Sequence, residues 1–124
     1  MVDDDSSARK GIARLLRTAG HDVRDFASAN EFLDALHPEA CGCLVLDARM
    51  PELSSKELHE ALEARGICLS IIVVTADDNE KTRQNAKEMK ADGFFRKPVD
   101  GTALLDAIDW ALRSTDKSDK HERE

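Results

Sequence analysis

Acidic, hydroxyl and amino side chains stand at four separate points of this chain, each next to a short apolar run. The four points are the acid cluster Asp3-Asp4-Asp5, Asp47, Thr75-Ala76 and Lys97-Pro98. Asp47 closes the run 44–46, which has the composition of a buried strand, and Thr75 closes a second such run, 71–74. Open α/β sheets carry their chemistry at the carboxyl ends of the strands. We therefore expect these four segments to converge at one edge of a sheet.

The side chains at these points suit a phosphoryl group held beside a divalent metal ion. Carboxylates from Asp3, Asp4 and Asp47 would repel one another unless a cation or a proton lay between them. Mg²⁺ takes a few carboxylate oxygens in near-octahedral geometry and retains waters that phosphate oxygens can replace. The Lys97 ammonium could then pair with a second phosphoryl oxygen, and the Thr75 hydroxyl could hydrogen-bond a third. In that arrangement Asp47 is the nucleophile, because carboxylates can form acyl phosphates.

Composition limits the classes of function open to the chain. Its 124 residues, 41% hydrophobic and 35% charged, are enough for one domain and leave no room for a second. The formal net charge of -7 argues against direct nucleic-acid binding, which needs a clustered basic face. No apolar stretch approaches membrane-spanning length, and the acidic start is unlike a signal peptide, so we expect a soluble protein.

The cysteines point to a reducing compartment. Residues Cys41, Cys43 and Cys68 are an odd set beside apolar runs, which predicts reduced core residues in a cytosolic protein. A metal or redox site at Cys41 and Cys43 lacks the second Cys/His pair that would complete a tetrahedral site.

Helical and strand-like patterns alternate along the chain. Helices are expected over 6–20, 30–36, about 58–66, 78–90 and, after Pro98, along a last amphipathic stretch that includes 104–112. Short strands are expected over 21–26, 43–46, 69–74 and 93–96. This alternation predicts a parallel sheet with helices on both faces, joined by right-handed crossovers. Residues 114–124 are charged and should form a frayed tail or linker remnant, which leaves 1–113 as the domain.

Over nearly its whole length the sequence resembles the receiver domains of two-component response regulators. The motifs that carry the resemblance, in order and at the usual spacing, are Val2-Asp3-Asp4-Asp5, Leu44-Val45-Leu46-Asp47-Ala48-Arg49-Met50-Pro51, Val74-Thr75-Ala76 and Gly93-Phe94-Phe95-Arg96-Lys97-Pro98. Arg49-Met50-Pro51 and the run 95–100 are most similar to the FixJ-type subgroup, whose members commonly join a receiver to a helix-turn-helix domain. The resemblance implies the flavodoxin-like doubly wound sheet with strand order 2-1-3-4-5.

The same resemblance implies a role for each acidic residue. It makes Asp47 the acceptor of phosphate from a histidine kinase. It also implies that Asp4 and Asp47 bind Mg²⁺ directly together with the backbone carbonyl of Arg49, and that Asp3 acts largely through water. The domain would then be a bacterial, cytoplasmic signalling module that assists its own phosphotransfer and dephosphorylation without being an enzyme in the ordinary sense.

The resemblance also implies a switch. Lys97 and Ala76 bind the phosphate, Thr75 responds to it, and Phe94 turns inward when Thr75 moves. This movement would link the site to the face formed by the fourth helix and the fifth strand, where a homodimer could form. DNA would be reached only through an output domain outside this chain, and the Lys97-Pro98 peptide bond is typically cis in this family.

Alternatives remain open from the sequence. A receiver-like interaction module that is not phosphorylated is the main rival, and an inactive truncated fragment is another form of it. A small aspartyl-phosphate phosphatase is less favoured, because such enzymes generally need a second acid and a cap over the substrate. Phe94 and Phe95 should point to opposite faces of one strand, so either could be the switch aromatic, and family register favours Phe94.

One feature departs from the family pattern: only Met1 and Val2 precede Asp3, where a full apolar strand is usual. In the order 2-1-3-4-5 that strand is central, so its loss would unpair backbone groups on both neighbours. Three explanations are open: the chain is truncated, a segment of another chain fills the gap, or the sheet has rearranged. We favour truncation. We expect low stability or oligomerisation, a less secure position for Asp3 and Asp4, and weaker Mg²⁺ binding.

Overall fold

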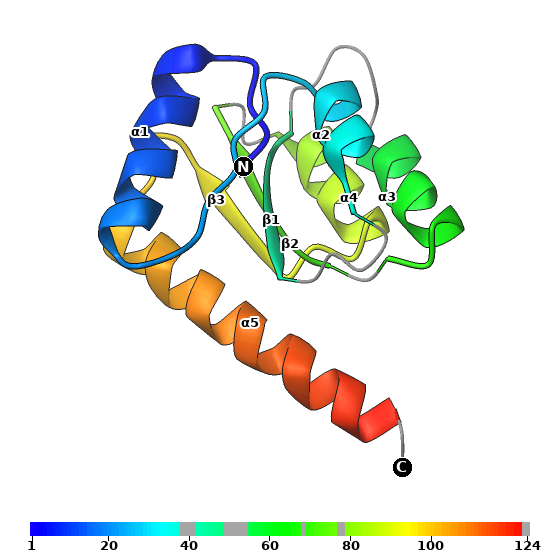
Figure 1. Ribbon diagram of the computed structural model, residues 1–124. Coiled ribbons are helices and arrows are strands. Elements are labelled where there is room, and N and C mark those ends of the chain that lie inside the picture. Colours follow the sequence, from blue (N-terminus) through cyan, green and yellow to red (C-terminus); the bar gives the residue numbers. More distant parts are fainter. Residues whose placement is uncertain (38–41, 49–54, 68, 77–78, 123–124) are drawn as a thin grey trace.

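A parallel sheet lies between two layers of helices in the computed structural model of the chain (Figure 1). The structure describes residues 1–37, 42–48, 55–67, 69–76 and 79–122. The strands are β1 (Cys43–Asp47), β2 (Ser70–Thr75) and β3 (Gly93–Arg96), and the helices are α1 (Ser6–Thr18), α2 (Ala29–Ala35), α3 (Ser55–Ala64), α4 (Glu80–Glu88) and α5 (Gly101–Glu122). The α/β class and most of the expected elements are therefore confirmed.

The sheet has the order β1-β2-β3, with every pairing parallel. All six residues of the central strand β2 are buried, as a strand covered on both faces requires. Ile71 and Val73 join the core under α2, α3 and α4, whereas Ile72 and Val74 join the core under α1 and α5. The apolar run is thus shared between two cores on opposite sides of the sheet.

The first residues of the chain pair with β1, although only Met1 and Val2 precede Asp3. Val2 donates a backbone hydrogen bond to the carbonyl of Val45 at 2.8 Å, and Asp47 donates one back to the carbonyl of Val2 at 2.9 Å. The Val2 side chain is fully buried in the core under α2, α3 and α4. A single residue in strand geometry therefore fixes the direction in which Asp3 and Asp4 leave the sheet.

The expected strand 21–26 is wrong as a regular strand, because it forms only an isolated bridge between Phe26 and Val2. Phe26 donates to the carbonyl of Met1 at 2.8 Å and accepts from the amide of Asp3 at 3.1 Å. Among the described residues, Met1 and Asp3 are the backbone hydrogen-bond partners of Phe26, on either side of its bridge to Val2. Val2 lies between Phe26 and β1, as the first three places of the expected order 2-1-3-4-5 require. The complete five-stranded order stays a prediction.

Helix α1 begins directly after the acid cluster. Its N-cap is Asp5, whose carboxylate accepts from the amides of Ser7 at 3.0 Å and Ala8 at 3.4 Å, and the helix begins at Ser6, the expected first residue. Aspartate is among the preferred N-cap residues because it satisfies amides that have no partner within the helix. The third acid of the cluster thus has a structural role of its own.

Helix α5 continues to Glu122, through most of the stretch that we expected to be a frayed tail. The domain boundary at residue 113 stays a prediction. Within the part of the chain that the structure describes, no helix is both long enough and apolar enough to cross a membrane.

Candidate functional site

The four chemistry-bearing segments meet at the carboxyl edge of the sheet, as predicted. Asp47 is the last residue of β1, Thr75 is the last residue of β2, and Lys97 directly follows β3. Carboxylate oxygens of Asp3, Asp4 and Asp47 lie within 4.8 Å of one another. Asp3 and Asp47 are buried and Asp4 is exposed, so the cluster opens to solvent on the side of Asp4.

Lys97 supplies a positive charge beside these acids. Its ammonium donates to Asp3 Oδ2 at 2.7 Å and to Asp47 Oδ2 at 3.4 Å. Burial opposes the charged ammonium, but the hydrogen bond to Asp3 and the charge of Asp47 outweigh that effect and raise the pKa of Lys97. One ammonium among three carboxylates leaves an excess of negative charge, which a divalent cation would offset.

The backbone holds Lys97 in place against the neighbouring strand. The Lys97 amide donates to the carbonyl of Thr75 at 2.7 Å, and the Lys97–Pro98 peptide bond is cis, as the family resemblance implied. The Thr75 side chain is completely buried, and Ala76 follows it at the exposed rim. The structure thus brings Thr75, Ala76 and Lys97 to the same edge, whereas Arg49, the expected carbonyl ligand, lies outside the described residues.

Asp3 is held by contacts that sequence reasoning missed. The Asp5 amide donates to Asp3 Oδ1 at 2.9 Å, and the guanidinium of Arg9 donates to the Asp3 carbonyl at 2.9 Å. Arg9 also bonds Asp25 at 3.2 Å, and Arg17 bonds the same carboxylate at 3.1 Å. Desolvation disfavours the charged form of Asp25, but hydrogen bonds and charge from Arg17 and Arg9 prevail and hold its pKa below the usual value.

Arg9 therefore links helix α1, the segment before α2 and the acid cluster. The local sequence does not indicate that Arg9 makes these contacts, because a single arginine on an amphipathic helix ordinarily faces solvent. The Arg9 side chain is only 15% exposed, which distinguishes it from a surface arginine. These contacts give the short chain start a support that regular strand pairing does not provide.

Replacing Arg9 with methionine should weaken Mg²⁺ binding about fivefold, the equivalent of about 1 kcal/mol, because the backbone of Asp3 loses a charged hydrogen-bond donor. Titration of Mg²⁺ against the melting temperature measures this affinity. The control is Arg14→Met, an exposed position on the same helix that removes the same charge. Equal loss in both variants would show that net charge, and not the Arg9 contact, sets the affinity.

Phe94 and Phe95 point to opposite faces of β3, as expected. Phe94 packs against the core under α2, α3 and α4, whereas Phe95 packs against the core under α1 and α5. The Arg83 guanidinium of α4 lies 5.9 Å from the centroid of the Phe94 ring. A cavity of about 450 Å³ lies beside this ring, and it is lined by Arg83, Ala86, Lys87, Ala91, Asp92, Gly93 and Phe94.

Comparison with known proteins agrees with the geometry of the site. The family model described as the response regulator receiver domain matches residues 1–109. This chain belongs to that family. Among curated relatives, the transcriptional regulatory protein FixJ of Azorhizobium caulinodans is 38% identical over 108 residues, which cover 87% of this chain and 51% of the relative. The transcriptional regulatory protein TdiR of Thauera aromatica is 40% identical over 112 residues, which cover 90% of this chain and 49% of the relative.

Solved receiver structures have the same fold. The crystal structure of FixJ-N is 34% identical, superposes with a TM-score of 0.80 and covers 90% of each chain. The structure of the response regulator StyR is 41% identical, with a TM-score of 0.78, and covers 98% of this chain and 62% of that one. The receiver domain described here spans about half the length of the curated relatives it matches.

Family membership confirms the flavodoxin-like fold and the resemblance to FixJ-type regulators. The chain is a receiver domain of the two-component response regulators, a class of signalling domain. A phosphoacceptor role is consistent with this membership, and a receiver-like module without phosphorylation is not favoured.

Proposed function

We propose that this receiver domain accepts a phosphoryl group on Asp47 from a sensor histidine kinase in the cytoplasm. The observation that carries the proposal is the position of the Asp47 carboxylate, 3.4 Å from the Lys97 ammonium and beside the carboxylates of Asp3 and Asp4. A nucleophile at the rim of a sheet, next to a cation, is arranged for attack on an anionic donor.

The acidic cluster fits Mg²⁺, because the ion prefers oxygen ligands and usually binds a small number of carboxylates. Asp4 and Asp47 would hold it together with the carbonyl of Arg49, and Asp3 would act through water. When bound, Mg²⁺ supplies positive charge that offsets the negative charge on the transferring group. The exposure of Asp4 supports this assignment, since ligand exchange needs an open side.

The positions of the side chains suit transfer of a phosphoryl group from the donor histidine to Asp47. An Asp47 oxygen forms a bond to phosphorus while the P–N bond to the donor histidine breaks, and the imidazole leaves. Lys97 then pairs with one phosphoryl oxygen while keeping its contact with Asp3. Ala76, an exposed residue, and the Thr75 hydroxyl would complete the phosphate site from the end of β2.

The direct test is phosphorylation by acetyl phosphate in the presence of Mg²⁺, followed by intact mass. We expect one added phosphoryl group on the unmodified protein and none on Asp47→Asn. The Asp106→Asn variant is the control, because it removes an exposed carboxylate from α5. Labelling of a folded Asp47→Asn protein, or no labelling of the folded unmodified protein, would refute the proposal.

The output would be a changed α4–β3 face, the counterpart of the fourth-helix and fifth-strand surface of the family. Thr75 ends the strand next to Phe94, whose ring contacts Arg83 of α4, so a movement of Thr75 toward phosphate can reach this face. The proposal includes two further steps. The domain forms a homodimer through that face, and DNA is bound through an output domain outside this chain.

Thr75→Val should uncouple phosphorylation from this change, because valine keeps the buried volume but lacks the hydroxyl. We expect the variant to be labelled by acetyl phosphate, with the chemical shifts of the Phe94 ring staying as in the unphosphorylated protein. Ser70→Ala is a comparison at the other end of β2. A ring shift in Thr75→Val equal to that of the unmodified protein would remove Thr75 from the switch.

A further inference from the structure

The cavity of about 450 Å³ between helix α4 and strand β3 has the size of a small-molecule site, for which about 300–1,000 Å³ is usual. Arg83, Ala86 and Lys87 line it from one face of α4, because residues three and four positions apart are neighbours on a helix surface. The other lining residues come from the segment 91–94, which leads into β3.

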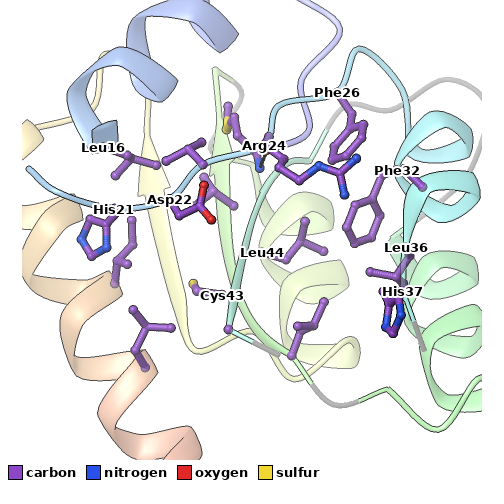
Figure 2. Close-up of a pocket in the computed structure, with 18 residues that line it drawn as sticks. Leu16, His21, Asp22, Arg24, Phe26, Phe32, Leu36, His37, Cys43 and Leu44 are labelled. Carbon is purple, nitrogen blue, oxygen red and sulfur yellow. Dashed lines mark hydrogen bonds between the residues drawn. The ribbon is translucent and has the colours of Figure 1, made fainter. Parts of the chain in front are cut away.

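A larger cavity, of about 570 Å³, lies beside β1. Figure 2 shows it between the segment that holds His21 and Arg24 and the start of β1, at Cys43 and Leu44. It lies in line with the parallel bridges of Val2, in the place of a strand of this fold. The larger cavity is therefore part of the sheet architecture, whereas the cavity beside α4 lies between the sheet and a helix.

The floor of the cavity beside α4 is apolar. Ala86, Ala91 and Gly93 are small, so they leave space next to the Phe94 ring that longer side chains would fill. Ala86 is buried, and Ala91 and Phe94 are partly buried against the core under α2, α3 and α4. A ligand in this cavity would therefore meet an apolar surface that the core supports from beneath.

The charged lining residues make the cavity locally positive. Arg83 and Lys87 are the cations, and Asp92 is the one carboxylate among the residues that line it. The Asp92 carboxylate accepts a hydrogen bond from the Ile71 amide at 3.1 Å, which ties it to β2. The chain as a whole has a formal net charge of -7, so a positive cavity is a local departure from its charge balance. Such a site favours an anion.

Arg83 brings its charge next to an aromatic surface. Its guanidinium lies over the Phe94 ring, 5.9 Å from the ring centroid. A guanidinium stacks on aromatic rings and presents planar N–H donors that match the geometry of a carboxylate. A carboxylate bound by Arg83 is therefore held close to the ring, and a flat apolar body attached to it can pack against Phe94 and the small residues of the floor.

We propose that this cavity binds a small aromatic carboxylate, with its charge at Arg83 and Lys87 and its ring against Phe94. A glutamate side chain would satisfy the cations but leave most of the apolar floor uncovered, so a free aromatic acid fits the cavity better than an acidic peptide does. The proposal does not rest on phosphorylation of Asp47. Because Phe94 is also the proposed switch aromatic, the ligand would act on the same face as the phosphoryl group.

The test uses the unphosphorylated 124-residue protein and 2-naphthoate, with no phosphodonor present. Calorimetry should show saturable binding of one molecule per chain, with a dissociation constant on the order of 0.1 mM for a ligand of this size. The NMR signals of the Phe94 ring and of the Ala91 and Gly93 amides should shift with the same midpoint. 2-Naphthamide, which has the ring without the charge, and acetate, which has the charge without the ring, should each bind about tenfold more weakly or worse.

Arg83→Met should weaken the binding of 2-naphthoate about tenfold, because methionine keeps an apolar side chain but lacks the charge. Lys81→Met removes the same charge at an exposed position of α4 that does not line the cavity, and it should bind as the unmodified protein does. The two comparison ligands test the same contacts without altering the protein.

Four results would each overturn the proposal. They are the absence of saturable binding to the folded protein, equal binding of 2-naphthamide or acetate, NMR shifts confined to residues away from the cavity, and undiminished binding to a folded Arg83→Met protein. A short glutamate-rich peptide that binds as tightly as 2-naphthoate would also overturn it, because the cavity would then be a contact for an acidic protein segment.

Discussion

Lys97→Met is expected to slow Mg²⁺-dependent phosphorylation of Asp47 about a hundredfold, the usual loss when one preorganised donor to developing charge is removed. The same change should lower the free energy of unfolding by about 2–3 kcal/mol at neutral pH without Mg²⁺, because it leaves buried carboxylates without their cation. Asp3 is fully buried and its carboxylate lies 2.7 Å from the Lys97 ammonium. Of the carboxylates in the cluster, Asp3 therefore loses the most stabilisation when the ammonium is removed.

The stability effect of Lys97 should depend on pH in a defined direction. The pKa of Lys97 is raised in the folded protein, so the folded state holds this proton more tightly than the unfolded chain. The contribution is therefore fully present below the unfolded lysine pKa of about 10.4, and it is lost as the pH rises through the folded value. The difference in stability between the unmodified protein and Lys97→Met should shrink over that alkaline range.

Urea unfolding at several pH values and labelling by acetyl phosphate measure the two effects separately. Lys81→Met, at an exposed position of α4, removes the same charge without touching the acid cluster. If Lys97→Met were labelled at the unmodified rate, Lys97 would have no part in phosphate transfer, whatever its effect on stability.

The sequence predicted the site well because its geometry follows from topology. Parallel strands present their carboxyl ends at one edge, so locating the ends of β1, β2 and β3 was enough to bring Asp47, Thr75 and Lys97 together. The alternation of side chains along a strand also placed the two phenylalanines correctly. Phe94 and Phe95 are neighbours on β3, so their side chains face opposite sides of the sheet.

What the sequence did not predict depends on pairing between distant segments. Residues 21–26 have strand-like composition, yet a regular strand needs a partner along its length, and Val2 offers only one bridge. The support of Asp3 by Arg9 is a tertiary contact between a side chain on a helix and a backbone carbonyl, which no local pattern encodes. We expected a less secure acid cluster from the short first strand, whereas the structure places Asp3 and Asp4 beside Asp47.

Asp4→Asn should remove stabilisation by Mg²⁺ while leaving the metal-free protein as stable as before, or slightly more stable. Asp4 is the exposed member of a cluster of three carboxylates, so its loss relieves repulsion without opening the core. A ligand present at a hundred times its dissociation constant stabilises the folded state by about 2.7 kcal/mol. The unmodified protein should gain this amount in saturating Mg²⁺, and the variant should gain much less at the same concentration.

Unfolding measured with and without Mg²⁺ separates these effects, and the adjacent Asp5 provides the control. Asp5→Asn removes the same charge one residue away and keeps the helix cap, because asparagine caps helices about as well as aspartate. A loss confined to Asp4→Asn identifies its carboxylate as a metal ligand. An equal loss in both variants would mean that the overall negative charge of the segment attracts the ion, and Asp4 would then have no specific place in the site.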